Sequence, residues 1–432
     1  MRGSVITAGS FFLSQGVRLA ANLALTRLLF PEAFGMMALV SVVLIGLTMF
    51  SDAGIGPSIS QHKRGDDPDF LNTAWTINVV RGALLWLMTC ALAVPAAHLY
   101  NAPELMVLLP VSGLALLIAG FDPTRIDTAQ RHLLLGRVMG LDLIAQIMGT
   151  GSMVLLAWAL QSVWALVIGA LIAAVAKLVL TTLFLPGAWN RFRWDREAGH
   201  DLIRFGRWIF LSTACSFLLS QGDKALLGIY LSLEQLGLYN IGYFLASFPM
   251  LLGQSVTGRI LIPLYRDHHP DNSAQDARRI RKMRYLISGG IMAMLIVASL
   301  IGVPLIGVMY DHRYASAGAI VVAIACVQMP QVVGLTYDQA ALAAGRSLPF
   351  FMLMALRAVT QTAAFLIGGA LGGLEGALIA QGLAYYALHL AVCLLARSFR
   401  VWDPLHDLAF MTLAILATAL AVWLNLDALQ QI

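Results

Sequence analysis

Two opposite charges lie side by side in an otherwise apolar segment, SFLLSQGDKALLGIYL, at residues 216–231. The charges are Asp223 and Lys224, and the segment is long enough to lie inside a membrane. A charge at the centre of a bilayer costs about 3 kcal/mol or more on insertion scales, so intramembrane charges indicate function. Neighbouring residues are about 100° apart on a helix. The sequence therefore predicts that Asp223 pairs with a base on another helix, while Lys224 faces a polar cavity.

Further polar residues fall inside apolar segments and share helix faces. Gln15, Arg18 and Asn22 are spaced i, i+3, i+7 and form one polar stripe, and Gln221 lies one turn from Lys224. Basic residues outnumber acidic ones in these segments, which favours a shared cavity for an anion over a lipid-facing position. The predicted cavity cations are Arg18, Arg81, Lys177 and Lys224, and the candidates for further polar or ion-coupling residues are Gln15, Asn22, Gln221 and Asp223. Structural ion pairing is the competing interpretation of the four cations.

The composition explains why these residues must be positioned by membrane-spanning helices. Of 432 residues, 59% are apolar and 12% are charged, whereas soluble domains carry roughly 25% charged residues. Apolar blocks of about 20 residues alternate with short charged loops, which indicates an all-α polytopic membrane protein. We predict thirteen spans at about 5–28, 34–57, 74–99, 104–121, 138–160, 163–185, 207–230, 236–262, 285–309, 315–342, 349–371, 374–396 and 406–425.

The loop charges predict the orientation of these spans. The loops after even-numbered spans hold nineteen Lys and Arg residues, whereas the loops after odd-numbered spans hold one, Arg313. By the positive-inside rule, the even loops and the N-terminus are cytoplasmic, and thirteen spans place the C-terminus in the periplasm. The net charge of +5 is thus a topology signal, and nucleic acid is not an expected partner. We expect a multi-pass protein of the inner (plasma) membrane.

Similar sequences recur in the two halves of the chain. Ser14-Gln15-Gly16 matches Ser220-Gln221-Gly222, and PEAFGMM at 31–37 matches LEQLGLY at 233–239. We therefore predict two six-helix lobes in a parallel repeat, a relationship that places substrate sites of transporters between the halves. The predicted divisions are an N-lobe at 1–190, an amphipathic basic cytoplasmic linker at 191–206, a C-lobe at 207–400, and one additional transmembrane helix at 401–432.

Motifs of soluble enzymes are missing from the sequence. There is no GxxxxGK[ST] motif for a nucleotide and no HExxH motif. The cysteines show no metal-binding or disulfide spacing and are expected to be small core residues. They are Cys90, Cys215, Cys326 and Cys393. No enzyme activity, metal or organic cofactor is expected, and coupling to a proton or sodium ion is left open, with Asp223 as its candidate carrier.

Several segments resemble the polysaccharide-export and oligosaccharide-flippase family of the multidrug/oligosaccharidyl-lipid/polysaccharide (MOP) superfamily. They are ALTRLLFPEAFGMMALV (24–40), DAGIGPSISQ (52–61), DDPDFLNTAWTINVVRG (66–82) and LSLEQLGLYNIGY (231–243). The resemblance implies two six-helix lobes, alternating access, and flipping of an undecaprenyl-diphosphate-linked oligosaccharide to the periplasmic leaflet. It also implies a cationic cavity, for which Arg18, Arg81 and Lys224 are suited, and partners among the polysaccharide-assembly proteins. Many members have fourteen spans, so the shorter C-terminal end departs from that form.

Three other functions remain open from the sequence. A cation-coupled multidrug or metabolite exporter of the same superfamily is expected to have an acidic or apolar cavity, which the basic excess disfavours. A membrane-bound polysaccharide polymerase or ligase needs a sizeable outer loop, and the predicted outer loops are short. A scaffold without transport activity is the third, and an assay is needed to separate it from a flippase.

Overall fold

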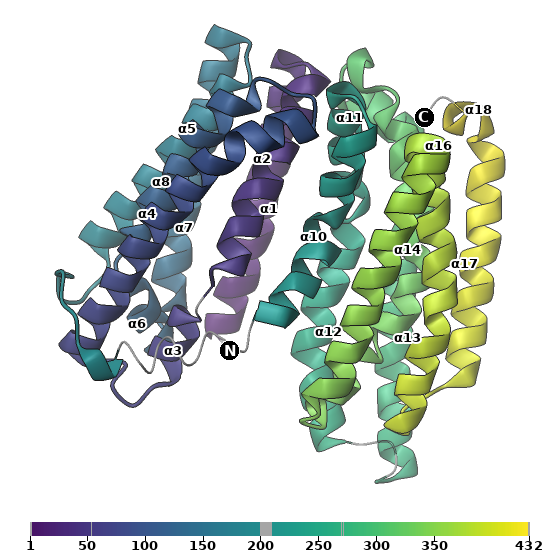
Figure 1. Ribbon diagram of the computed structural model, residues 1–432. Helices are drawn as coiled ribbons and strands as arrows, with labels where there is room; N and C mark the ends of the chain where they lie inside the picture. The colour runs from purple at the N-terminus through teal and green to yellow at the C-terminus, as the bar shows by residue number, and fades with distance from the viewer. Residues whose placement is uncertain (1, 53, 199–209, 269, 271, 431–432) are drawn as a thin grey trace. The chain divides into compact units, whose positions relative to one another are not determined.

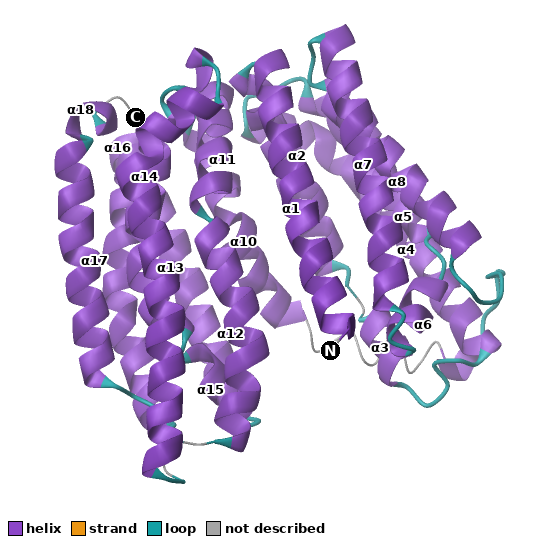
Figure 2. Cartoon of the chain, turned by 180° about the vertical axis from the view of Figure 1, so that it is seen from behind, coloured by secondary structure: helices purple, strands orange, loops and turns teal. Residues whose placement is uncertain are grey.

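The computed structural model describes residues 2–52, 54–198, 210–268, 270 and 272–430, and within these ranges all regular structure is helical. Figure 2 shows the loops confined to the ends of the helices. The chain divides into two compact units, Met1–Phe217 (the N-unit) and Leu218–Ile432 (the C-unit). The boundary falls inside helix α10, Phe210–Tyr230.

The helices of the N-unit match the first six predicted spans (Figure 1). The predicted second span, 34–57, is longer than its helix. A left-handed residue, Gly54 (φ 64°), follows the end of α2 and starts the separate short helix α3. The elements are α1 (Arg2–Leu28), α2 (Pro31–Phe50), α3 (Ile55–Gln61), α4 (Pro68–Leu99), α5 (Leu105–Gly120), α6 (Arg125–Arg131), α7 (Leu135–Leu160) and α8 (Trp164–Phe184).

The C-unit contains the last six predicted spans and the second part of the seventh, 207–230, which crosses the boundary between the units. Two of them are merged in α16, which is interrupted by non-helical backbone at Gly372 and Gly373. The predicted ninth span, 285–309, is shorter than its helix. Helix α13 begins at Ala274 and thus includes the basic residues just before the span. The elements after α10 are α11 (Leu233–Ala246), α12 (Phe248–Asp267), α13 (Ala274–Met309), η1 (His312–Tyr314), α14 (Ala317–Leu335), α15 (Asp338–Ala343), α16 (Ser347–Ser398), α17 (Pro404–Leu424) and α18 (Leu426–Leu429).

Length and composition select eight helical segments as candidate spans, or ten if each of two bent pairs is one span. The bent pairs are α5 with α6, at 56°, and α11 with α12, at 44°. Helices α1 and α10 are outside this set. They contain six of the polar residues predicted from the sequence, Gln15, Arg18, Asn22, Gln221, Asp223 and Lys224, whereas Arg81 and Lys177 lie in the candidate spans α4 and α8. The protein is an all-α, multi-pass membrane protein, as predicted. The count of thirteen and the parallel repeat stay predictions.

Local sequence signals explain where several helices begin. Asp67 accepts a hydrogen bond from the Asp69 amide at the start of α4, with Pro68 in the first turn. Ser232 and Gln235 form a reciprocal capping box on α11. The side chain of Asp403 accepts a hydrogen bond from the His406 amide at the start of α17. These short-range bonds satisfy backbone groups that a helix end leaves unpaired.

Small residues allow close packing within each unit. In the N-unit, α4 lies against α5 at Gly82 and Gly120, where an added Cβ would meet the backbone of the other helix. In the C-unit, Gly368 lies against Gly376 across the break in α16. The central element of the C-unit is α14, which lies in the candidate span His312–Ala343 together with η1 and α15. In an apolar 18-residue window of that span 83% of the residues are buried, against 44% or less in the other seven of the eight candidate segments.

The segment before α10 includes the predicted linker, 191–206. Of that linker, residues 199–206 lie outside the described residues. The described part runs along the first turns of α4, where the Arg191 amide donates to Asn72 Oδ1 and Thr76 donates to the Arg193 carbonyl. Arg193 also pairs with Asp69, with 2.7 Å between nitrogen and oxygen. These contacts hold this stretch against the N-unit.

Candidate functional site: charged residues within the membrane-spanning helices

The polar stripe of α1 contains the most exposed of the predicted cavity cations. Arg18 is exposed, whereas Gln15 and Asn22 are half-buried. A different side chain anchors α1, because the Ser14 hydroxyl donates to Gln146 Oε1 of α7 at 2.6 Å. Within the described residues, Arg18 makes no hydrogen bond or ion pair. Its guanidinium is therefore available to a ligand from outside the N-unit.

Arg81 lies half-buried in α4 and contacts the end of α2. Its Nε donates to the Ser51 hydroxyl at 2.9 Å, and its Nη2 donates to the Thr48 carbonyl at 2.9 Å. A cation at a helix C-terminus is stabilised by the unpaired carbonyls there. The side chain of Asp52 accepts a hydrogen bond from the Gly54 amide just beyond this end. Arg81 thus has a structural contact in addition to its predicted role.

Lys177 of α8 lies between two carboxylates. Its Nζ is 3.6 Å from Asp122, which follows α5, and 3.9 Å from Asp142 of α7. Sequence reasoning singled out Lys177 but missed Asp122, whose position directly after a predicted span resembles that of an ordinary loop acid. The arrangement joins three elements of the N-unit through one ammonium group.

Two acids that follow Gly120, the last residue of α5, have raised pKa values. Burial raises the pKa of Asp122 to about 6, although the Lys177 ammonium opposes this shift. Burial also raises the pKa of Asp127 to about 6, with a smaller contribution from the charge of Asp122. The two carboxyl groups therefore gain or lose protons near neutral pH.

The structure contradicts the predicted partners of Asp223 and Lys224. Asp223 and Lys224 are partners, with 3.2 Å between Nζ and Oδ2, and both are buried. The Lys side chain is long enough to close the 100° between adjacent helix positions. From α11, the Tyr239 hydroxyl donates to Asp223 at 2.8 Å, and the Tyr243 ring lies 4.2 Å from the ammonium. No basic residue from another helix is needed as a partner for Asp223.

A second group of polar side chains continues this region of the C-unit. Gln361 donates to the Leu218 carbonyl of α10 at 3.2 Å and accepts from the Tyr385 hydroxyl at 2.9 Å. Tyr385 in turn accepts from Gln381. Gln221, which the sequence placed on the same face as Lys224, is half-buried. The sequence signal for this group was the presence of glutamine and tyrosine inside apolar spans.

One more intramembrane cation is fixed by an acid. Both terminal nitrogens of Arg357 in α16 donate to Asp338 of α15, at 2.6 and 2.9 Å. Such bidentate pairs are the strong form of the Arg–carboxylate interaction. Arg357 is consequently held inside the C-unit.

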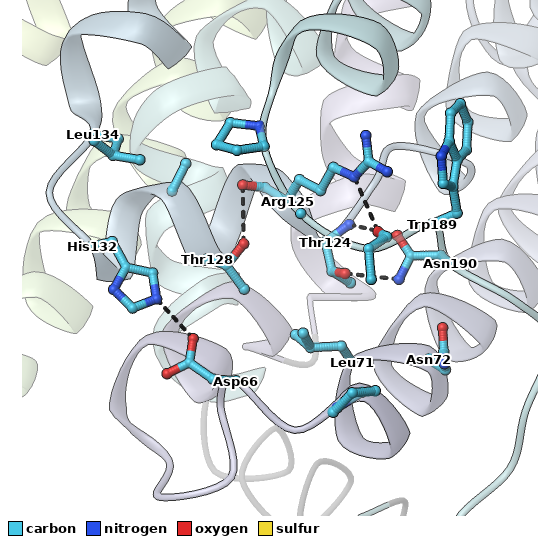
Figure 3. Close-up of a pocket in the computed structure, with 15 residues that line it drawn as sticks. Asp66, Leu71, Asn72, Thr124, Arg125, Thr128, His132, Leu134, Trp189 and Asn190 are labelled. Atoms are coloured by element: carbon cyan, nitrogen blue, oxygen red, sulfur yellow. Dashed lines mark hydrogen bonds and ion pairs between the residues drawn. The ribbon is translucent and has the colours of Figure 1, made fainter.

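A cavity of about 310 Å³ lies near the charged loops of the N-unit (Figure 3). It is bordered by Arg125, Trp189 and Asn190, and at another edge His132 is bonded to Asp66. The Arg125 side chain donates to the Ala188 and Thr182 carbonyls, and its guanidinium lies over the Trp189 ring. Because these contacts occupy the guanidinium, the cavity offers little free charge for an anionic substrate.

A family model described as "Polysaccharide biosynthesis protein" matches residues 24–319. The chain belongs to this family. TuaB of Bacillus subtilis, a teichuronic acid biosynthesis protein, is 22% identical over 251 residues, which are 57% of this chain and 52% of TuaB. The chain thus spans about half the length of TuaB. ExoT of Rhizobium meliloti, a succinoglycan biosynthesis transport protein, is 23% identical over 84% of this chain and 73% of ExoT.

Solved structures of MOP-superfamily transporters share the fold of this family member. The lipid II flippase MurJ in an inward closed conformation aligns with a TM-score of 0.68 and 10% identity, over 99% of this chain and 97% of MurJ. An inward-facing multidrug resistance MATE transporter aligns with a TM-score of 0.62 and 12% identity, over 90% and 95% of the two chains. The family predicted from the sequence is confirmed by the family match, and these two alignments show that the chain has the predicted fold.

Proposed function

We propose that this protein flips a lipid-diphosphate-linked oligosaccharide from the cytoplasmic to the periplasmic leaflet by alternating access, as a step in surface polysaccharide synthesis. The family match over residues 24–319 carries the proposal, and the transport role printed for ExoT supports it. The substrate carries the negative charge of a diphosphate, which cannot cross hydrocarbon unaided. An undecaprenyl chain is the lipid that the resemblance of the sequence implies.

The four predicted cavity cations have different roles in this proposal. Arg18 contacts the diphosphate, because its guanidinium is exposed and two parallel N–H groups match phosphate oxygens. Arg81, Lys177 and Lys224 contribute positive potential, while their contacts within each unit keep them in position. Gln15 and Asn22 supply neutral hydrogen-bonding groups beside Arg18. In this proposal the three paired cations stay in fixed positions and contribute positive potential, whereas Arg18 is available to bind the diphosphate.

The proposal includes the orientation and energy source of the protein. The N-terminus is cytoplasmic and the C-terminus periplasmic in the inner membrane, as the loop charges predict. Transport is driven by a proton or sodium gradient, with Asp223 as the coupling residue, or by the membrane potential, and it needs no organic cofactor. The protein is a transporter without enzyme activity and works beside other polysaccharide-assembly proteins.

Deletion of the gene in its host tests the function. We expect surface polysaccharide to disappear and a diphosphate-linked repeat unit to accumulate on the inner leaflet, which also identifies the substrate. Complementation with the unaltered gene is the control. Unchanged glycan with greater sensitivity to cationic drugs would instead indicate an exporter. A reporter fused after Ile432 tests the orientation, and a cytoplasmic signal would show that the number of spans is even.

A further inference from the structure

Three side chains of different types converge where α16 ends and α17 begins. His389 and Cys393 lie one turn apart on α16, and Asp407 lies in the first turn of α17. His389 Nε2 is 3.3 Å from Asp407 Oδ2 and 3.2 Å from Cys393 Sγ, and Sγ is 3.4 Å from the same Oδ2. The three donor atoms thus form a nearly equilateral triangle.

The triangle has the size of one face of a zinc coordination tetrahedron. Zinc binds Cys sulfur at about 2.3 Å and His nitrogen or carboxylate oxygen at about 2.0–2.2 Å, so neighbouring ligand atoms are about 3.3–3.6 Å apart at tetrahedral angles. The three distances observed are 3.2, 3.3 and 3.4 Å. One ion would therefore fit with small movements of the side chains.

More polar groups surround the Asp407 carboxylate than its oxygens can accept as hydrogen-bond donors. Oδ2 also accepts from the Trp402 indole at 2.8 Å, so that three groups share an oxygen with two lone pairs. The other oxygen accepts from the Tyr337 hydroxyl at 2.6 Å and contacts His406 Nδ1 at 3.2 Å. A cation between Oδ2, Nε2 and Sγ would relieve the crowding, because His389 and Cys393 would then bind the ion.

The surroundings suit a buried metal ion. The side chains of His389 and Asp407 are 17% and 8% exposed. A thiolate and a carboxylate neutralise a divalent ion, which removes most of the cost of burying its charge. Tyr337 and Trp402 already orient the carboxylate, as the outer hydrogen-bonding partners of metal ligands do. The nitrogen and sulfur ligands disfavour magnesium and calcium, which prefer oxygen.

We propose that His389, Cys393 and Asp407 form a binding site for zinc, with a fourth position open to water or a further ligand. The ion would join the end of α16 to the start of α17 and stabilise this part of the C-unit. The site is separate from the cations assigned to the diphosphate substrate, so the proposal does not depend on the transport function. Sequence reasoning grouped Cys393 with the apolar core, because Asp407 lies beyond the intervening loop.

Cobalt(II) titration of the purified full chain tests the site. The protein carries a tag without histidine, is treated with a chelator and is dialysed before titration. We expect one equivalent of cobalt to bind with a thiolate-to-cobalt charge-transfer band, which zinc abolishes by displacement. Cys393→Ser should remove the band and weaken zinc binding at least tenfold, whereas the control Cys90→Ser should retain both. Absence of the band in the unaltered protein would overturn the proposal.

Two further measurements keep the test independent of how well the ligand variants fold. Zinc should slow alkylation of Cys393 in the unaltered protein, measured by mass spectrometry, while Cys90 is alkylated at an unchanged rate. Tyr337→Phe should weaken zinc binding by about 10- to 100-fold, the usual effect of removing an outer partner. Equal alkylation rates of Cys393 with and without zinc would contradict the site.

Discussion

Asp223 and Lys224 form a buried ion pair between neighbours in the sequence, with 3.2 Å between Nζ and Oδ2. Tyr239 bonds to the acid and Tyr243 lies beside the ammonium, so both charges are compensated within the C-unit. This relationship changes the interpretation of Lys224 substitutions, since loss of transport in such a variant can arise from loss of stability.

Removing one member of this pair should destabilise the protein. Lys224→Ala leaves Asp223 buried without its cation, and breaking a buried pair costs on the order of 3 kcal/mol. We expect a lower Tm for Lys224→Ala, Lys224→Gln and Asp223→Asn, with much of the loss recovered in the double variant Asp223→Asn/Lys224→Gln. Thermal unfolding in detergent measures this, with exposed Lys282→Ala as the control. Additive losses in the double variant would contradict the coupling.

Arg18→Ala should behave differently, because its side chain is exposed and without a partner in the described residues. We expect export to fall at least tenfold, the effect of about 1.4 kcal/mol and within the value of a charge-assisted hydrogen bond, while protein level and Tm are unchanged. Arg18→Lys should retain part of the activity. Arg137→Ala, at the exposed start of α7, is the control. Normal export by Arg18→Ala would refute the assignment.

The raised pKa of Asp127, about 6 against 3.8 in an unfolded chain, predicts a pH-dependent effect of Asp127→Asn. The folded protein binds the proton more tightly between these values, so the stability contributed by this group falls as pH rises from about 4 to 6. Asp127→Asn should raise Tm at pH 7.5 and have little effect near pH 4. Tm measured across this range checks the trend.

Asp66 supplies a control of opposite sign for that experiment. The hydrogen bond from His132 is the largest of the effects that lower its pKa. A lowered pKa gives stability that is present above the unfolded value and is lost as pH falls. Asp66→Asn should therefore lower Tm at pH 7.5, modestly because the side chain is half exposed. Identical pH responses of the two Asn variants would contradict both pKa shifts.

Gly368→Val should disrupt the hairpin formed by the two halves of α16. A Cβ at Gly368 would lie 2.8 Å from the Cα of Ala377, so the helix backbones must separate. Overpacking of this kind costs roughly 1–3 kcal/mol. Gly290→Val is the control, because no atom lies within 4 Å of an added Cβ there. Equal Tm values for the two variants would show that the contact at Gly368 is not close.

The sequence by itself determined the helical membrane class, the approximate positions of most helices, and the stripe of Gln15, Arg18 and Asn22. These features follow from hydropathy and from the 3.6-residue period, which depend on neighbours along the chain. Family membership was also accessible, because its motifs are local. The exact end of α2 was not, since Gly54 adopts a left-handed conformation that hydropathy does not register.

Tertiary structure decided which polar groups meet. Lys177 of α8 lies close to Asp122, which follows α5, and Cys393 of α16 lies close to Asp407 of α17. Asp223 and Lys224 pair because the long lysine side chain bends towards its neighbour, where the tyrosines of α11 complete the contacts. A charge buried in a membrane must find a partner. The identity of that partner depends on side-chain reach and helix packing, neither of which is encoded in the spacing of residues along one helix.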